Sequence, residues 1–133
     1  MVRMRPVVTT ALTGLLLATV TAPHAAAATV PEVPVDPDRT VFTDNPRIVD
    51  QHPARVESWS RNGEGLRVNF TAGTPQCYGA HVVATESAET VTVELSVGTR
   101  PEAADRMCIA IALDATMDVP LQQPLGDRTV VSA

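Results

Sequence analysis

The sequence predicts an all-β protein: a small antiparallel β-sandwich, immunoglobulin-like or related, with six to seven short strands. Apolar and polar residues alternate with a period of two through most of the second half of the chain, as in strands that bury one face. Residues that form turns separate these runs at short intervals, and 133 residues is the length of a single domain. A small closed barrel is the alternative that this pattern leaves open.

Two hairpins are the best-defined elements. Asn62-Gly63 is the strongest hairpin signal in the chain, and it would join a strand at 56–60 to one at 66–71. A second hairpin would pair 78–86 with 90–97. After a helical turn at 101–106, further strands are expected at 106–113, 118–122 and 125–131.

Residues 1–28 have the order of a secretory signal peptide. Arg3 and Arg5 give a positive start, an apolar stretch follows, and residues 25–28 are all Ala, which suits cleavage after Ala28 or Ala27. The apolar stretch has about 14 residues, too few to cross a bilayer core of roughly 30 Å. We therefore expect a secreted or envelope-associated protein with no membrane span after cleavage.

Residues 29–53 are rich in proline and aspartate. Each proline fixes φ and removes a backbone donor, so the segment cannot be helical and is a poor central strand. The prediction is a Pro/Asp-rich linker at 29–53, extended and mobile over 29–45 and with a short edge strand at 47–50, followed by the β-sandwich domain at 54–133.

The two cysteines, Cys77 and Cys108, are expected to form a disulfide, because exported proteins fold in an oxidising compartment. A bridge between residues 31 positions apart would stabilise a small domain by about 3–4 kcal/mol. In the expected strand at 106–113, Cys108 alternates with larger apolar residues, which puts the bridge at the periphery. Trp59 would share its strand face with the charged residues Arg55, Glu57 and Arg61, which also places it away from the central core.

No catalytic set is apparent, so no enzyme, cofactor or metal is expected. The mature chain has only two imidazoles, His52 and His81, and it lacks a Gly-x-Ser-x-Gly elbow and a phosphate-binding glycine loop. An enzyme would require a polar cluster near His81. Asn69 begins a glycosylation pattern, but it lies within an expected strand, so we interpret this as a chance match.

The charge balance argues against nucleic acid as a partner. Removal of Arg3 and Arg5 with the signal peptide would change the net charge from −5 to −7, and the chain has no lysine. An acidic surface repels phosphate backbones.

One resemblance covers roughly the last 75 residues of the chain. It lies in 70–79, 91–95, 98–103, 106–109, 118–121 and 124–128. In these stretches the chain resembles an uncharacterised family of small secreted proteins from actinobacteria, with a single-disulfide β-domain after a signal peptide. The resemblance implies the source and the compartment and supplies no catalytic residues. In class, the chain is also similar to subtilisin-inhibitor and neocarzinostatin-type secreted proteins, which typically carry two disulfides.

The leading hypothesis is therefore a monomeric, non-enzymatic interaction module of the cell envelope or the medium. Trp59 and Tyr78 are candidate anchors for a protein or small-molecule partner, because aromatic residues often fill that role. Arg100 and Arg106, in an expected loop, are two further candidate anchors. A small-ligand carrier is one alternative, and it needs an apolar cleft between the sheets. A secreted protease inhibitor is the other, and it would offer an exposed loop such as 98–107.

Overall fold

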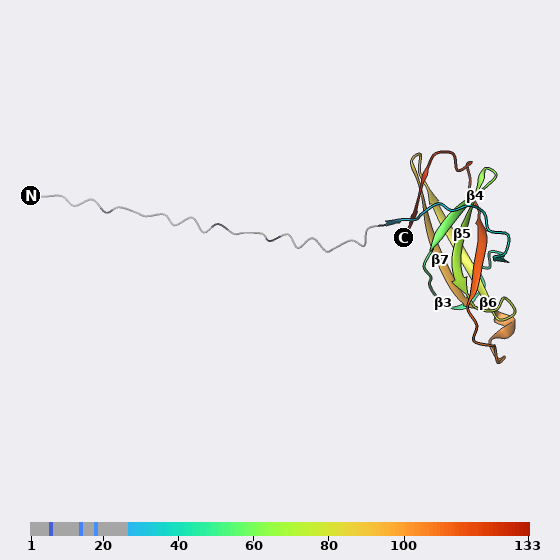
Figure 1. Ribbon diagram of the computed structural model, residues 1–133. Coiled ribbons are helices and arrows are strands. Elements are labelled where there is room, and N and C mark those ends of the chain that lie inside the picture. Colours follow the sequence, from blue (N-terminus) through green and yellow to red (C-terminus); the bar gives the residue numbers. More distant parts are fainter. Residues whose placement is uncertain (1–5, 7–13, 15–17, 19–26) are drawn as a thin grey trace, which may run out of the picture.

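The protein is a sandwich of two β-sheets packed face to face (Figure 1), as the sequence predicts. The computed structural model describes Pro6, Gly14, Ala18 and residues 27–133. The expected signal peptide therefore lies almost wholly outside the described residues. The elements are β1 (Ala28–Thr29), β2 (Thr40–Phe42), β3 (Val49–Pro53), β4 (Ser58–Asn62), β5 (Gly65–Ala72), β6 (Tyr78–Glu86), β7 (Thr90–Thr99), the 3-10 turn η1 (Pro101–Ala103), β8 (Leu113–Val119) and β9 (Thr129–Ser132).

One sheet has the order β2-β8-β5-β4, and the other is built around β7. Strand β6 pairs along one edge of β7, while β9 and β3 pair with opposite halves of its other edge. The pairs β2–β8 and β7–β9 are parallel, so both sheets are mixed rather than wholly antiparallel. The described part of the chain also has more strands than the six or seven expected, because β1, β2 and β3 come from the predicted linker.

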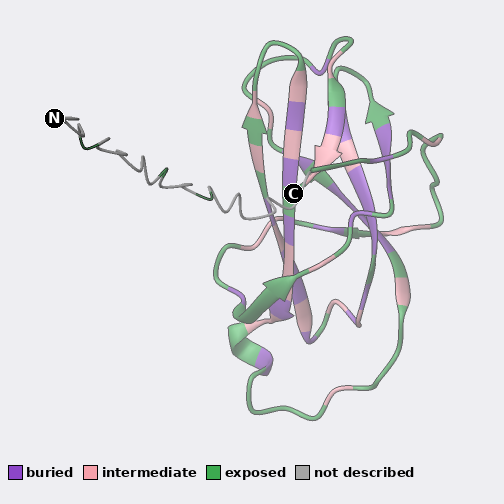
Figure 2. Ribbon diagram, turned by 90° about the vertical axis from the view of Figure 1, so that its left-hand side faces the viewer, coloured by how far each residue is buried: buried purple, intermediate pink, exposed green. Residues whose placement is uncertain are grey.

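The core lies between the sheets, where alternate residues of the long strands meet. Along much of β5 and β7, buried positions alternate with half-buried or exposed ones (Figure 2), which confirms the period-two pattern. Both predicted hairpins are present, as β4–β5 and β6–β7, and Gly63 takes a left-handed φ of 60° in the first turn. The largest fully buried side chains include Phe70, Leu66 and Met117.

The prediction of a linker at 29–53, mobile over 29–45, is wrong, because this segment pairs with strands of both sheets and wraps around the sandwich. Glu32 bridges to Trp59 at the edge of β4, whereas β2 pairs with β8 at the opposite edge of the same sheet. The chain between them crosses the outer face of this sheet. There, the hydroxyl of Ser60 donates to the carbonyl of Pro34, and the guanidinium of Arg39 donates to the carbonyl of Ala115. We call residues 28–53 the belt.

The belt also explains why Trp59 is buried, although the sequence pattern predicted a position away from the core. Its side chain is only 6% exposed and belongs to the core cluster. The indole N–H donates to the carbonyl of Val30 at 2.9 Å, and the guanidinium of Arg61 lies 5.6 Å from the ring centroid. The shared-face prediction failed because Arg55 and Glu57 precede β4, which begins at Ser58, and because Arg61 lies at the exposed end of this strand.

Beneath the belt, the outer face of the β2-β8-β5-β4 sheet holds a buried polar cluster. The amide nitrogen of Asn69 donates to the hydroxyls of Ser58 and Ser60 at 3.0 and 3.3 Å, and the hydroxyl of Thr116 donates to the carbonyl of Val68. Asn69 is 2% exposed, so its side chain is not accessible to a glycosylating enzyme in the folded protein. Its partners are satisfied inside the fold, which makes the cluster structural.

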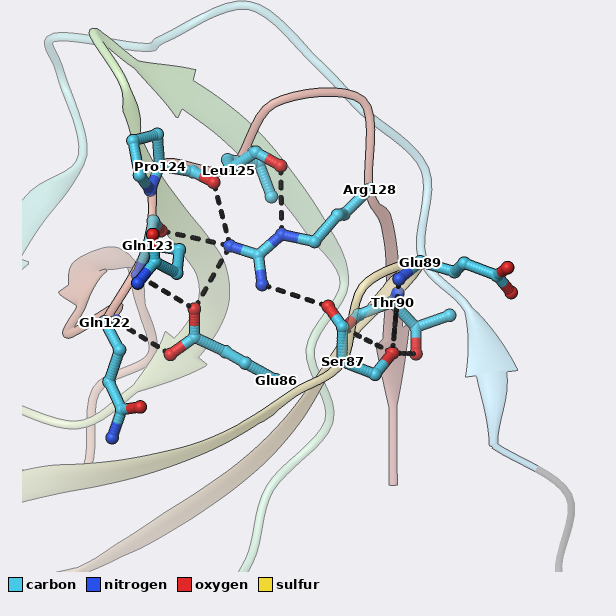
Figure 3. Close-up of polar contacts among 9 residues, drawn as sticks. All are labelled: Glu86, Ser87, Glu89, Thr90, Gln122, Gln123, Pro124, Leu125 and Arg128. Atoms are coloured by element: carbon cyan, nitrogen blue, oxygen red, sulfur yellow. Dashed lines mark hydrogen bonds and ion pairs between the residues drawn. The ribbon is translucent and has the colours of Figure 1, made fainter.

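An ion pair fixes the segment between β8 and β9 onto the β6–β7 hairpin (Figure 3). The carboxylate of Glu86 accepts hydrogen bonds from the backbone N–H groups of Gln122 and Gln123 and from Arg128. The guanidinium of Arg128 also donates to four backbone carbonyls, those of Ser87, Gln123, Pro124 and Leu125. The backbone N–H of Gln122, and then Arg128, hold the pKa of Glu86 below its usual value of 4.5.

This arrangement predicts a loss of stability in acid. Because the pKa of Glu86 is lower in the folded than in the unfolded state, its contribution is present above about pH 4.5 and is lost as the pH falls through the folded pKa. Urea unfolding measured from pH 7 to pH 3 should show Glu86→Gln destabilised at pH 7, with a smaller further loss on acidification than the wild type. The control is Asp114→Asn, which removes the same charge from an exposed position. If Glu86→Gln and the wild type lose stability in parallel, the ion pair is not the cause.

Candidate functional site

The candidate site lies at the end of the sandwich where β5 and β7 finish and β6 begins. A long exposed segment, after η1 and before β8, extends beyond the ends of the sheets there (Figures 1 and 2). We call residues 104–112 the strap. The strap was predicted to form a strand, and that prediction is wrong. It has no strand partner within the described chain, and β8 begins only at Leu113.

The Cys77–Cys108 disulfide tethers the middle of the strap, and its predicted formation is confirmed. The two Cα atoms are 6.2 Å apart; Cys77 is buried and Cys108 half-buried. Neither cysteine belongs to the main core cluster, so the bridge is peripheral, as expected. Cys77 immediately precedes β6, so the bridge holds the strap beyond the end of that strand. This position explains why the strap does not pair with the edge of a sheet, although its residues alternate as in a strand.

The strap exposes apolar side chains that the sequence pattern had assigned to a buried face. Met107 is 102% exposed, Ile109 63% and Ile111 43%. Within the described residues, no backbone N–H of 107–112 donates to another backbone group. The segment therefore combines apolar, β-branched side chains with free backbone donors and acceptors, the properties of a strand that lacks a partner.

A pocket of about 460 Å³ lies between the strap and the ends of the sheets. It has a predominantly apolar lining with polar groups on one side. The lining residues are Asp50 and His52 of β3, 71–73 at the end of β5, Tyr78, 97–99 of β7 and 109–112 of the strap.

Strand β3 is irregular where it borders this pocket. Its register against β7 shifts between Val49 and His52, and the residue between them at the rim, Asp50, has a left-handed φ of 54°. Bulges of this kind redirect side chains and often occur beside functional sites. The short edge strand expected at 47–50 is present, displaced to Val49–Pro53.

Tyr78 and Arg100, two predicted anchors, do lie near each other. Both line a second hollow of about 380 Å³, and Tyr78 also lines the pocket under the strap. A Cβ atom at Gly73 would lie 2.4 Å from the Tyr78 ring, so only glycine allows this ring position. Arg100 donates from its guanidinium to the carbonyl of Pro75 and from its backbone to that of Cys77, and so supports the turn before β6.

The other predicted anchors have different positions. Arg106 is exposed on the strap, whereas Trp59 is buried in the core and is unavailable to a partner. Sequence reasoning proposed an exposed loop at 98–107, which includes the start of the strap, but it did not identify Asp50 or the exposure of 108–112. A signal for the strap was that residues 107–112 are apolar on both faces, unlike the amphipathic runs of β5 and β7.

His81 and His52 each have a polar contact with an aspartate of the belt. His81 Nδ1 lies 2.8 Å from the carboxylate of Asp44, which also accepts the backbone N–H of Val82 and so fixes the belt to the edge of β6. His52 contacts only the carbonyl of Asp50. No cluster of three or more potential metal ligands occurs in the part of the chain that the structure describes.

No helix within the described residues is both long and apolar enough to cross a membrane. In comparison with known proteins, the chain matches no family model, no curated protein and no solved structure. The interpretation of the site therefore depends on its own geometry.

Proposed function

We propose that this protein is an exported, non-enzymatic interaction module of the cell envelope or the medium. Its strap would pair, strand to strand, with an extended segment of a partner protein. The observation that carries the proposal is the strap itself: three exposed apolar side chains and a free backbone on a segment tethered by a disulfide.

Strand addition suits this geometry because it uses both the unpaired backbone and the exposed apolar side chains of the strap. Backbone groups of the strap would supply hydrogen bonds, and alternate side chains such as Ile109 and Ile111 would supply apolar contacts. The bridge at Cys108 limits the conformations of the free strap, which lowers the entropy lost on binding.

Export is supported by the disulfide and by the expected signal peptide. The pairing of β1 favours one of the two expected cleavage sites. Ala28 pairs with Ser132 and Thr29 with Val131, so cleavage after Ala27 would leave β1 complete.

The strap can be tested with a triple variant, Met107→Ser/Ile109→Ser/Ile111→Ser. Its control, Val35→Ser/Val41→Ser/Val83→Ser, removes three exposed apolar side chains elsewhere. In affinity capture from envelope extracts, the wild type and the control should recover the same partner, and the strap variant should recover about tenfold less or none. Equal recovery by all three proteins would contradict the proposal.

A protease inhibitor is the second candidate, favoured by Met107. This side chain is fully exposed and immediately precedes the disulfide-bonded Cys108, so it is presented on a constrained loop. The test is a panel of extracellular serine proteases. Inhibition that disappears in Met107→Gly would favour this function over strand addition, and the absence of inhibition would remove it.

A further inference from the structure

We propose that the pocket under the strap binds a small, mainly apolar molecule that carries a positive charge, with the cation at Asp50. This inference goes beyond the proposed function and does not depend on it. Strand addition would use the backbone of the strap, whereas the small molecule would occupy the space between the strap and the sheets.

The size and walls of the pocket suit such a ligand. About 460 Å³ falls within the range of roughly 300–1,000 Å³ typical of small-molecule sites. The apolar walls come from both sheets and from the strap, and include Ala72, Val97, Ile109 and Ile111. Burial of an apolar body against these side chains would supply most of the binding free energy.

The charged group at the rim of the pocket determines which sign of charge the ligand should carry. Asp50 is the only acid or arginine that lines the pocket, and it takes part in no ion pair within the described chain. The other titratable groups in the lining are His52 and Tyr78. A cationic group at Asp50 would gain a charge partner, whereas the carboxylate would repel an anion. The net charge of −5 would also repel an anion.

The backbone of β3 places the carboxylate at this rim. The register shift and the left-handed φ of Asp50 interrupt the ladder with β7 beside the pocket. A left-handed conformation is uncommon for residues other than glycine, but aspartate and asparagine tolerate it best. Asp50→Asn therefore removes the charge and leaves the backbone conformation accessible, which makes it a sharp test.

The experiment uses three probes of similar shape: phenylethylammonium, neutral 2-phenylethanol and anionic 3-phenylpropanoate. Each is titrated into the full-length mature protein at pH 8, where imidazole side chains are mostly neutral. Amide resonances are followed by NMR. The cation should bind saturably, most tightly of the three, and should shift resonances of 71–73, 97–99 and 109–112.

Two variants and a control locate the site. Asp50→Asn should weaken binding of the cation about fivefold and leave the neutral alcohol within about twofold. Ala112→Phe should block all three probes by filling the pocket, whereas Ala88→Phe, on an exposed loop outside it, should block none. The proposal is overturned by the absence of saturable binding, by shifts elsewhere, by equal binding of cation and anion, or by an unchanged affinity in Asp50→Asn. If the wild type captures no partner but still binds the cation, only the proposed function is removed.

Discussion

A chain that begins at Ala54 is expected not to fold, although it contains the whole domain that the sequence pattern delimits. The belt supplies β2 and β3 and buries the ring of Phe42, which lies 5.7 Å from that of Phe70 between centroids. Without the belt, the edges of β7 and β8 and the polar cluster around Asn69 would be exposed to water, and Trp59 would lose its acceptor at Val30.

Circular dichroism and amide NMR of 54–133 and 28–133 test this expectation. The longer chain should give dispersed resonances and cooperative unfolding, and the shorter one should give neither. A single substitution keeps the test quantitative: Phe42→Ala should lower the free energy of unfolding by about 3–5 kcal/mol. A dispersed, cooperatively unfolding 54–133 would show that the belt is a linker after all.

Removal of the disulfide is the second change with a large expected effect. Cys77→Ser/Cys108→Ser frees a loop of 31 positions in the unfolded chain, so the free energy of unfolding should fall by about 3–4 kcal/mol. The strap should also lose its tether to β6. Its NMR resonances should then sharpen, while those of the core strands keep their positions.

Denaturant unfolding of the double variant, and of the wild type with and without a reductant, measures this effect. The control is Ala88→Ser, at an exposed position outside the bridge. The account predicts that reduced wild type and the double variant agree with each other. A loss below about 1 kcal/mol in both would show that the bridge adds little to stability.

The elements that could be predicted are those set by neighbouring residues. The alternation in β5, β6 and β7 and the Asn62-Gly63 turn act over a few residues, so both hairpins follow from the sequence alone. The belt could not be predicted in this way. Its prolines do weaken local structure, but its ladder contacts are to residues far away in the chain, such as Thr40 with Ala115.

The candidate site was predictable only in part. Tyr78 and Arg100 were expected near a binding surface, and the structure places both beside the pockets. The strap was missed because alternation indicates strand propensity without showing whether a partner strand exists. Asp50 was missed because a left-handed backbone at a bulge arises from the pairing of β3 with β7, which no local pattern reveals.

Hydrogen exchange of individual amides tests most directly the central claim, that the backbone of the strap is unpaired in the free protein. In the free protein at low concentration, the amides of Ile109 and Ile111 should exchange as fast as those of an unstructured peptide, while those of Val68 and Val93 should be strongly protected. If Ile109 and Ile111 are protected as strongly as the core strands, the strap already has a partner within the molecule, and the account is contradicted.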